Sequence, residues 1–175
     1  MPVFGKYTIG WPRFLIPMWG FGTTAMTGVA LRVWLASVYV AENCKVDQIS
    51  VNINTASAGM RIRIGVYADN GGTPQGGALL VDSGDIDVST TGTKTYAISP
   101  AVNLVKGTVW VCVLTEDAVM AFNRSAGTAS YLGGVMDGCY YTLDAWGALT
   151  DPCPAVTALA TSRPVIVMRV SEWGP

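Results

Sequence analysis

The stretch MRIRIGVY at residues 60–67 decides the fold. Side chains of a β-strand point alternately to its two faces. One face of this stretch is apolar and carries Met60, Ile62, Ile64 and Val66. The other face carries Arg61, Arg63 and Tyr67 and is expected to meet solvent. This period of two predicts a half-buried strand.

The same alternation continues outward from this strand. At residues 49–54 it predicts that Ile49, Val51 and Ile53 point inward and that Ser50, Asn52 and Asn54 lie on a solvated face. We expect these two strands to be antiparallel neighbours. Residues 108–114 and 165–170 are apolar on both faces, which is typical of a strand covered by a second sheet or a second subunit.

Turn-forming clusters separate the expected strands. They occur at residues 69–74, 89–93 and 99–100. Asn70-Gly71 is expected to turn the chain because both residues tolerate positive φ. Trp110 is expected to anchor the apolar strand and to need one acceptor for its N–H. Short strands at this spacing predict an all-β, antiparallel β-sandwich with jelly-roll-like connections.

The composition limits what the protein can do. The chain has 175 residues, enough for one domain with an appended arm. Only 13% of its residues are charged, against about 25% in typical soluble proteins. We therefore expect partners to cover part of its surface. With 11 basic and 12 acidic residues, a nucleic-acid partner is not expected. The absence of histidine excludes Ser-His-Asp, Cys-His and His-metal chemistry.

Residues 1–28 are expected to form an extended docking arm, and residues 29–175 the sandwich. The arm carries six aromatic residues for contact with a partner: Phe4, Tyr7, Trp11, Phe14, Trp19 and Phe21. The uncharged run 14–31 reaches the minimum length of a membrane helix, but Pro17 and several glycines interrupt it. We expect neither a membrane span nor a secretory signal.

Four cysteines, Cys44, Cys112, Cys139 and Cys153, show neither zinc spacing nor a Cys-x-x-Cys pair. Free cysteine is common in protein cores, so we expect mostly buried, reduced thiols. Cys139 and Cys153 flank a loop. Their pairing in an oxidising medium remains open.

Charged clusters were considered as chemical sites. Asp82, Asp85 and Asp87, with Asp69 nearby in sequence, raise the question of bound calcium, but the spacing is not that of an EF-hand and fits a solvated turn. Glu116 and Asp117, with Glu42, could in principle supply the carboxylate pair of a glycosidase, but the sequence provides no cleft to hold them at the required separation. We expect no enzyme, no metal and no cofactor. Arg61 and Arg63 are expected either to reach a neighbouring subunit's carboxylates or to be solvated.

The segment from residue 125 to 162 is rich in glycine and is expected to form strands joined by long loops. Four aromatic residues of this segment are candidate contacts: Tyr131, Tyr140, Tyr141 and Trp146. They suit either a sugar platform or packing between subunits. We favour subunit packing.

The order of motifs resembles a jelly-roll module of tailed-bacteriophage virion proteins. The resemblance rests on residues 63–72, Pro74, residues 77–84, 88–92 and 107–111, with the sequences RIGVYADNGG, GALLVDSG, VSTTG and GTVWV. It covers about residues 33–124. The module occurs in tail fibres, tail-tip proteins and other appendages. The resemblance implies a fold and a setting, and no catalytic residue is carried over.

The leading hypothesis is a virion structural protein, made in the host cytoplasm, whose sandwich self-associates. A trimer is favoured by analogy with the family. The chain would be a subunit of a tail fibre or tail appendage that docks on the particle through its N-terminal arm and faces the host receptor. A capsid decoration or cement protein is the first alternative. A carbohydrate-binding module for a host surface glycan is the second.

Overall fold

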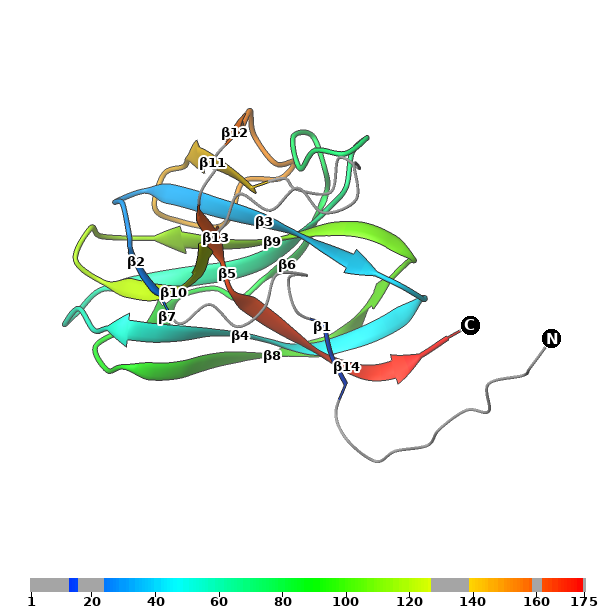
Figure 1. Ribbon diagram of the computed structural model, residues 1–175, viewed down its shortest axis with the longest axis horizontal. Coiled ribbons are helices and arrows are strands. Elements are labelled where there is room, and N and C mark those ends of the chain that lie inside the picture. The colour runs from blue at the N-terminus through cyan, green and yellow to red at the C-terminus, as the bar shows by residue number, and fades with distance from the viewer. Residues whose placement is uncertain (1–12, 16–23, 127–138, 159–161, 175) are drawn as a thin grey trace.

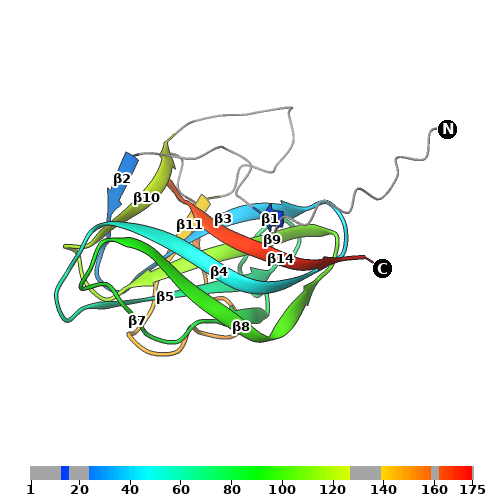
Figure 2. The same ribbon diagram turned by 90° about the horizontal axis from the view of Figure 1, so that it is seen from below.

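A computed structural model describes residues 13–15, 24–126, 139–158 and 162–174. The described chain consists of strands without a helix and forms two antiparallel sheets that face each other (Figures 1 and 2). The predicted all-β sandwich is confirmed. The strands are β1 (Arg13–Leu15), β2 (Thr24–Thr27), β3 (Arg32–Val40), β4 (Cys44–Thr55), β5 (Arg61–Ala68), β6 (Leu79–Asp82), β7 (Ile86–Asp87), β8 (Gly92–Leu104), β9 (Gly107–Thr115), β10 (Ala121–Ala126), β11 (Cys139–Leu143), β12 (Thr157–Ala158), β13 (Ser162–Pro164) and β14 (Ile166–Trp173).

Each sheet has seven strands within the described residues. The first sheet follows the order β1-β14-β4-β10-β13, with β2 on β10 and β8 on β4. We call it sheet A. Sheet B follows the order β12-β11-β3-β9-β5-β6, with β7 on β5. Figure 1 shows β3 and β9 in one layer and β4 and β8 in the other.

The expectation that residues 49–54 and 60–67 form neighbouring strands was wrong. They belong to β4 in sheet A and β5 in sheet B, which lie across the core from each other. Alternation shows which face of a strand is buried, but it does not show which strand it pairs with. The short connection at residues 56–60 carries the chain from one sheet to the other.

The core between the sheets matches the predicted inward faces. Ile49, Val51 and Ile53 of β4 meet Ile62, Ile64 and Val66 of β5 in one cluster, and each is at most 2% exposed. On the opposite face of β4, Ser50 was expected to be solvated, but it is buried, and its hydroxyl is satisfied by a hydrogen bond with Thr95 of β8. Burial of these aliphatic side chains is the main force that holds the sheets together.

A second apolar cluster covers the outer face of sheet B, which we call the outer cluster. It contains Val33, Leu35, Tyr67, Trp110, Cys112, Leu114, Leu149 and Cys153. The loop at residues 144–153 supplies the last two. The strand at residues 108–114 is therefore buried on both faces, as predicted, and its outer cover comes from its own chain.

Two strand faces differ from their predicted burial. Tyr67 was expected to meet solvent, but it is only 1% exposed because residues 144–153 lie over it. Its hydroxyl donates to the carbonyl oxygen of Thr150 at 2.9 Å. Residues 165–170 were expected to be apolar on both faces, but Val167 and Arg169 of β14 are only half-buried. Nothing comparable to the 144–153 loop covers that face of sheet A among the described residues.

The predicted turn at residues 69–72 is present, but the residues with positive φ differ in part from those predicted. Positive φ falls on Gly71 and Gly72 rather than on Asn70. One carboxylate oxygen of Asp69 accepts the N–H of Gly72, and the other accepts the indole N–H of Trp110 at 2.7 Å. Trp110 thus has the acceptor it needs. The predicted turn at residues 99–100 instead lies inside β8.

Parts of residues 1–28 belong to the sandwich. β1 pairs with β14, and β2 pairs with β10. Leu15 and Met26 of these strands are buried. The described portion of the expected arm is therefore paired with sheet A.

Gly65 lies where sheet B and its loop cover approach closely. A β-carbon at this position would be 2.5 Å from both the Val81 carbonyl oxygen and Leu149 Cδ1. We expect Gly65→Ala to lower the free energy of unfolding by about 1–3 kcal/mol, the usual cost of overpacking, measured by denaturant titration. The clash with Val81 involves backbone. The double variant Gly65→Ala/Leu149→Ala should therefore remain less stable than Leu149→Ala alone, and equal stability of these two variants would contradict this packing.

Candidate functional site

The structure separates the candidate aromatic residues. Tyr140 contacts the outer cluster, where its ring lies 5.3 Å from that of Trp110 in an edge-on arrangement. Trp146 packs against the same cluster. Tyr141 instead packs against the core cluster, 6.3 Å from the Trp34 ring. All three are half-buried, and Tyr131 lies outside the described residues. The described rings contact their own chain and do not share one face.

Arg61 and Arg63 belong to a charged cluster within the chain, which we call the Arg61 cluster. Its acidic members are Asp82, Asp85 and Glu116. Arg61 donates to both carboxylate oxygens of Glu116, at 2.8 and 3.1 Å, and to Asp85 at 2.6 Å. Arg63 pairs with Asp82 at 3.0 Å and with Asp85 at 2.7 Å. β5 thus faces carboxylates of its own chain, which neither expectation for these arginines included. Sequence spacing alone could not show that residues 82–85 and 116 return to this strand.

The carboxylates considered for calcium are also occupied within the chain. Asp87 accepts hydrogen bonds from the N–H and hydroxyl of Ser89, and Asp69 accepts from Trp110 and Gly72. Within the described residues, no group of three or more His, Cys, Asp or Glu side chains is placed to hold a metal ion.

The residues considered as a glycosidase pair are not brought together. Glu116 is held by Arg61, and Asp117 accepts the Ser57 hydroxyl. Both lie just beyond the end of β9, whereas Glu42 follows the end of β3 at the opposite end of the sandwich.

All four cysteines are buried and none is joined in a disulfide bond. Burial raises the pKa of the Cys139 thiol to about 12 and that of the Cys153 thiol to about 11. Burial also raises the pKa of Cys44 and Cys112. These thiols are therefore protonated and weakly nucleophilic at neutral pH.

Phe14 is the one residue of the six arm aromatics that the structure describes, and it is 49% exposed on β1. The other candidate docking residues, Phe4, Tyr7, Trp11, Trp19 and Phe21, lie outside the described residues.

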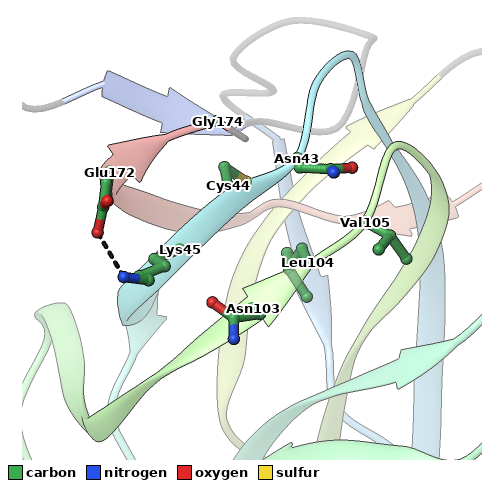
Figure 3. A pocket seen from close by; sticks show the side chains of 8 residues that line it. All are labelled: Asn43, Cys44, Lys45, Asn103, Leu104, Val105, Glu172 and Gly174. Atoms are coloured by element: carbon green, nitrogen blue, oxygen red, sulfur yellow. Dashed lines mark hydrogen bonds and ion pairs between the residues drawn. The ribbon is translucent and has the colours of Figure 1, made fainter.

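A pocket of about 390 Å³ opens at the end of the sandwich where β14 ends (Figure 3). The residues that line it are Asn43, Cys44, Lys45, Asn103, Leu104, Val105, Glu172 and Gly174. The Lys45 ammonium contacts the Glu172 carboxylate at 2.6 Å. Three strands form this wall because Asn103, Lys45 and Glu172 stand in register on β8, β4 and β14. Sequence analysis missed the pocket, since these residues are far apart along the chain.

Large exposed apolar side chains occur mostly at the two ends of the sandwich. Leu31, Val119 and Leu143 lie around the start of β3 and the end of β9. Tyr39 and Val105 lie at the opposite end, beside the pocket. Such side chains favour contact with another molecule.

The comparisons leave the chain without an assigned family. No known protein family and no curated protein matches its sequence. Among the described residues, the structure has no helix long and apolar enough to cross a membrane.

The Arg61 cluster should make stability depend on pH. The hydrogen bonds from Arg61 lower the pKa of Glu116 below its ordinary value of 4.5. A lowered pKa in the folded state stabilises the protein above the unfolded-state pKa, and this contribution is lost as pH falls through the folded-state value. We expect Glu116→Gln to reduce the fall in unfolding free energy below pH 4.5, measured by urea titration across pH. Glu42→Gln, measured at a concentration at which the chain is monomeric, is the matched control, because no ion pair of Glu42 occurs among the described residues. An equal effect of both variants would contradict a special role for Glu116.

The buried thiols should resist modification while the protein is folded. We expect an aromatic disulfide reagent at pH 8 to react slowly with native protein and to titrate all four thiols after unfolding. If only two thiols react after unfolding without reductant, a disulfide such as Cys139–Cys153 is present, contrary to the structure.

Proposed function

We propose that this chain is a structural protein of a tailed-phage virion, a self-associating subunit of a tail fibre or tail appendage. The observation that carries the proposal is the gathering of exposed apolar side chains at the two ends of the sandwich. Only 13% of the residues are charged, and exposure of these apolar side chains to water is unfavourable in free energy. Contact with neighbouring subunits would remove them from water.

The resemblance to the phage module gives the setting. RIGVY lies in β5, LLVD forms β6, and GTVWV begins β9, and these three strands are neighbours in sheet B. VSTTG leads into β8 of sheet A. The motif thus builds adjacent strands and turns of the sandwich, a role that supports a shared fold.

The proposal assigns docking on the particle to the N-terminal segment. Because β1 and β2 pair with sheet A, the docking residues are assigned to the part of the segment outside these strands. Residues 1–12 include three of the aromatic candidates, Phe4, Tyr7 and Trp11. Phe14, which is half exposed on β1, adjoins them.

Two alternatives remain as proposals. A capsid decoration protein would use the same exposed ends, and imaging of labelled protein on particles separates head from tail. A carbohydrate-binding module is favoured by the pocket, whose Asn43, Asn103 and Glu172 side chains offer hydrogen-bonding groups beside Leu104. The aromatic rings first considered for sugar stacking pack on their own chain instead.

Self-association of the purified chain is the direct test. We expect sedimentation velocity to show an oligomer at micromolar concentration, with a trimer favoured, because the exposed ends lose contact with water on assembly. A chain that stays monomeric up to millimolar concentration would contradict the self-associating subunit.

Docking is tested by deletion of residues 1–12. We expect the truncated chain to retain the circular dichroism and thermal midpoint of the full chain, since β1 and β2 remain, but to be absent from purified particles. Particles would be assayed by mass spectrometry after complementation of a gene deletion. Replacement of Phe4, Tyr7 and Trp11 by serine in the full chain is the matched control for length. Normal incorporation of both variants would refute docking through this segment.

A further inference from the structure

The two ends of the sandwich differ in chemistry. We call the end at which β3 begins and β9 finishes the Arg32 end, and the end at which β3 finishes and β9 begins the Glu42 end. They lie at the left and right of Figure 1, respectively. Each combines exposed aliphatic side chains with a charged group that has no ion-pair partner among the described residues.

Arg32 is held in place by two aromatic rings. Its guanidinium carbon lies 5.0 Å from the centre of the Trp34 ring and 4.4 Å from that of Tyr141. Its Nε is buried without a hydrogen-bond acceptor, and no carboxylate in the described chain pairs with the side chain. A guanidinium positioned by two rings is pre-organised to receive a carboxylate.

Exposed leucines flank this arginine. Leu143 lies opposite Arg32 on β11 and is 66% exposed. Leu31 precedes Arg32, is 40% exposed and is tied to the same strand end because its carbonyl oxygen accepts the N–H of Asp144. The Arg32 end therefore presents a cation between aliphatic side chains.

The backbone at Leu31 is unusual for leucine. Its φ of 59° lies in the left-handed region, where the described chain otherwise places only glycine. A bulky residue there is strained, at a cost on the order of 1 kcal/mol, and glycine would avoid the strain. Leu31 is 40% exposed and is not among the residues that pack against either apolar cluster. Contact with another molecule would account for a leucine at this position.

The Glu42 end has matching features. Glu42 is exposed in the β3–β4 turn and lacks an ion-pair partner in the described chain. Val105, which is 72% exposed, and Tyr39 lie at the same end, and Val105 lines the pocket of Figure 3. The pocket offers space for an aliphatic side chain.

We infer that copies of this chain associate head to tail, with the Arg32 end of one copy against the Glu42 end of the next. The carboxylate of Glu42 then pairs with Arg32, and Leu31 or Leu143 enters the pocket beside Val105. This contact rests on the self-association in the proposed function, and it identifies the two surfaces through which the copies associate. Since two different surfaces meet, the contact repeats and produces a ring or a filament.

The sheet faces are less suited to this role. The outer face of sheet B lies under residues 144–153. On the outer face of sheet A, Ser50 hydrogen-bonds Thr95 at 3.1 Å, and Arg169 makes a two-bond pair with Asp47. Polar groups that already form hydrogen bonds with one another gain little free energy from contact with a partner. The ends are the described surfaces that combine apolar exposure with an unpaired charge.

The experiment uses one variant for each end of the full chain. Leu143→Asp changes the Arg32 end, and Val105→Asp changes the Glu42 end, while Thr93→Asp on the exposed face of β8 is the matched control for added charge. Sedimentation velocity measures association, and circular dichroism checks the fold. We expect each end variant to raise the dissociation constant at least tenfold and Thr93→Asp to leave it unchanged.

Mixing the two end variants separates head-to-tail contact from symmetric contact. Each variant keeps one intact end, so an equimolar mixture should form a heterodimer that grows no further. If only one end variant weakens association, or if the mixture stays monomeric while each variant is folded, head-to-tail contact is overturned. A wild-type chain that never associates would instead overturn the self-association of the proposed function.

Leu31→Gly provides a variant that cannot fail through misfolding at this turn. Glycine adopts the observed φ without strain, so we expect an equal or higher thermal midpoint together with at least tenfold weaker association. An unchanged dissociation constant would remove Leu31 from the contact.

Discussion

The burial of β9 on both faces is the constraint on which the rest of the structure depends. Its inner face contributes Val109, Val111 and Val113 to the core between the sheets, and its outer face places Trp110 and Cys112 in the outer cluster. An isolated sandwich would leave that outer face in water. The chain therefore returns over sheet B at residues 144–153, and the Arg61 cluster helps to fix this cover, because Asp82 pairs with Arg63 and accepts the N–H of Leu149.

This internal cover changes which surfaces remain for partners. A two-sided apolar strand suggests a hidden subunit interface, but here the chain satisfies it alone. The aromatic residues Tyr140 and Trp146 serve that cover, and the outer face of sheet A is polar and hydrogen-bonded. The remaining apolar exposure lies at the ends of the sandwich, beside Arg32 at one end and the pocket at the other. Assembly through ends agrees with the proposed place in a virion appendage.

Sequence periodicity predicted the strands and their buried faces because burial of alternate side chains is a local property. Ile62 and Ile64 of β5 and the inward residues of β4 are as expected. Partner choice is not local, so β4 and β5 were wrongly expected to be neighbours, and the same limit hid the charged cluster. Arg61 meets Glu116 only because β5 and β9 pair in register. The Lys45, Asn103 and Glu172 wall of the pocket arises in the same way from three strands.

The sequence by itself determined the all-β class, the buried faces of the central strands, the positive-φ glycine turn after β5 and the sparse charge that points to covered surface. Each follows from residue type and local spacing. Only the tertiary structure decided that Tyr67 is buried, that the arginines of β5 pair within the chain, and that Arg32 lies between two rings. Those outcomes depend on register between distant strands and on where a loop returns, which side-chain chemistry along one strand does not encode.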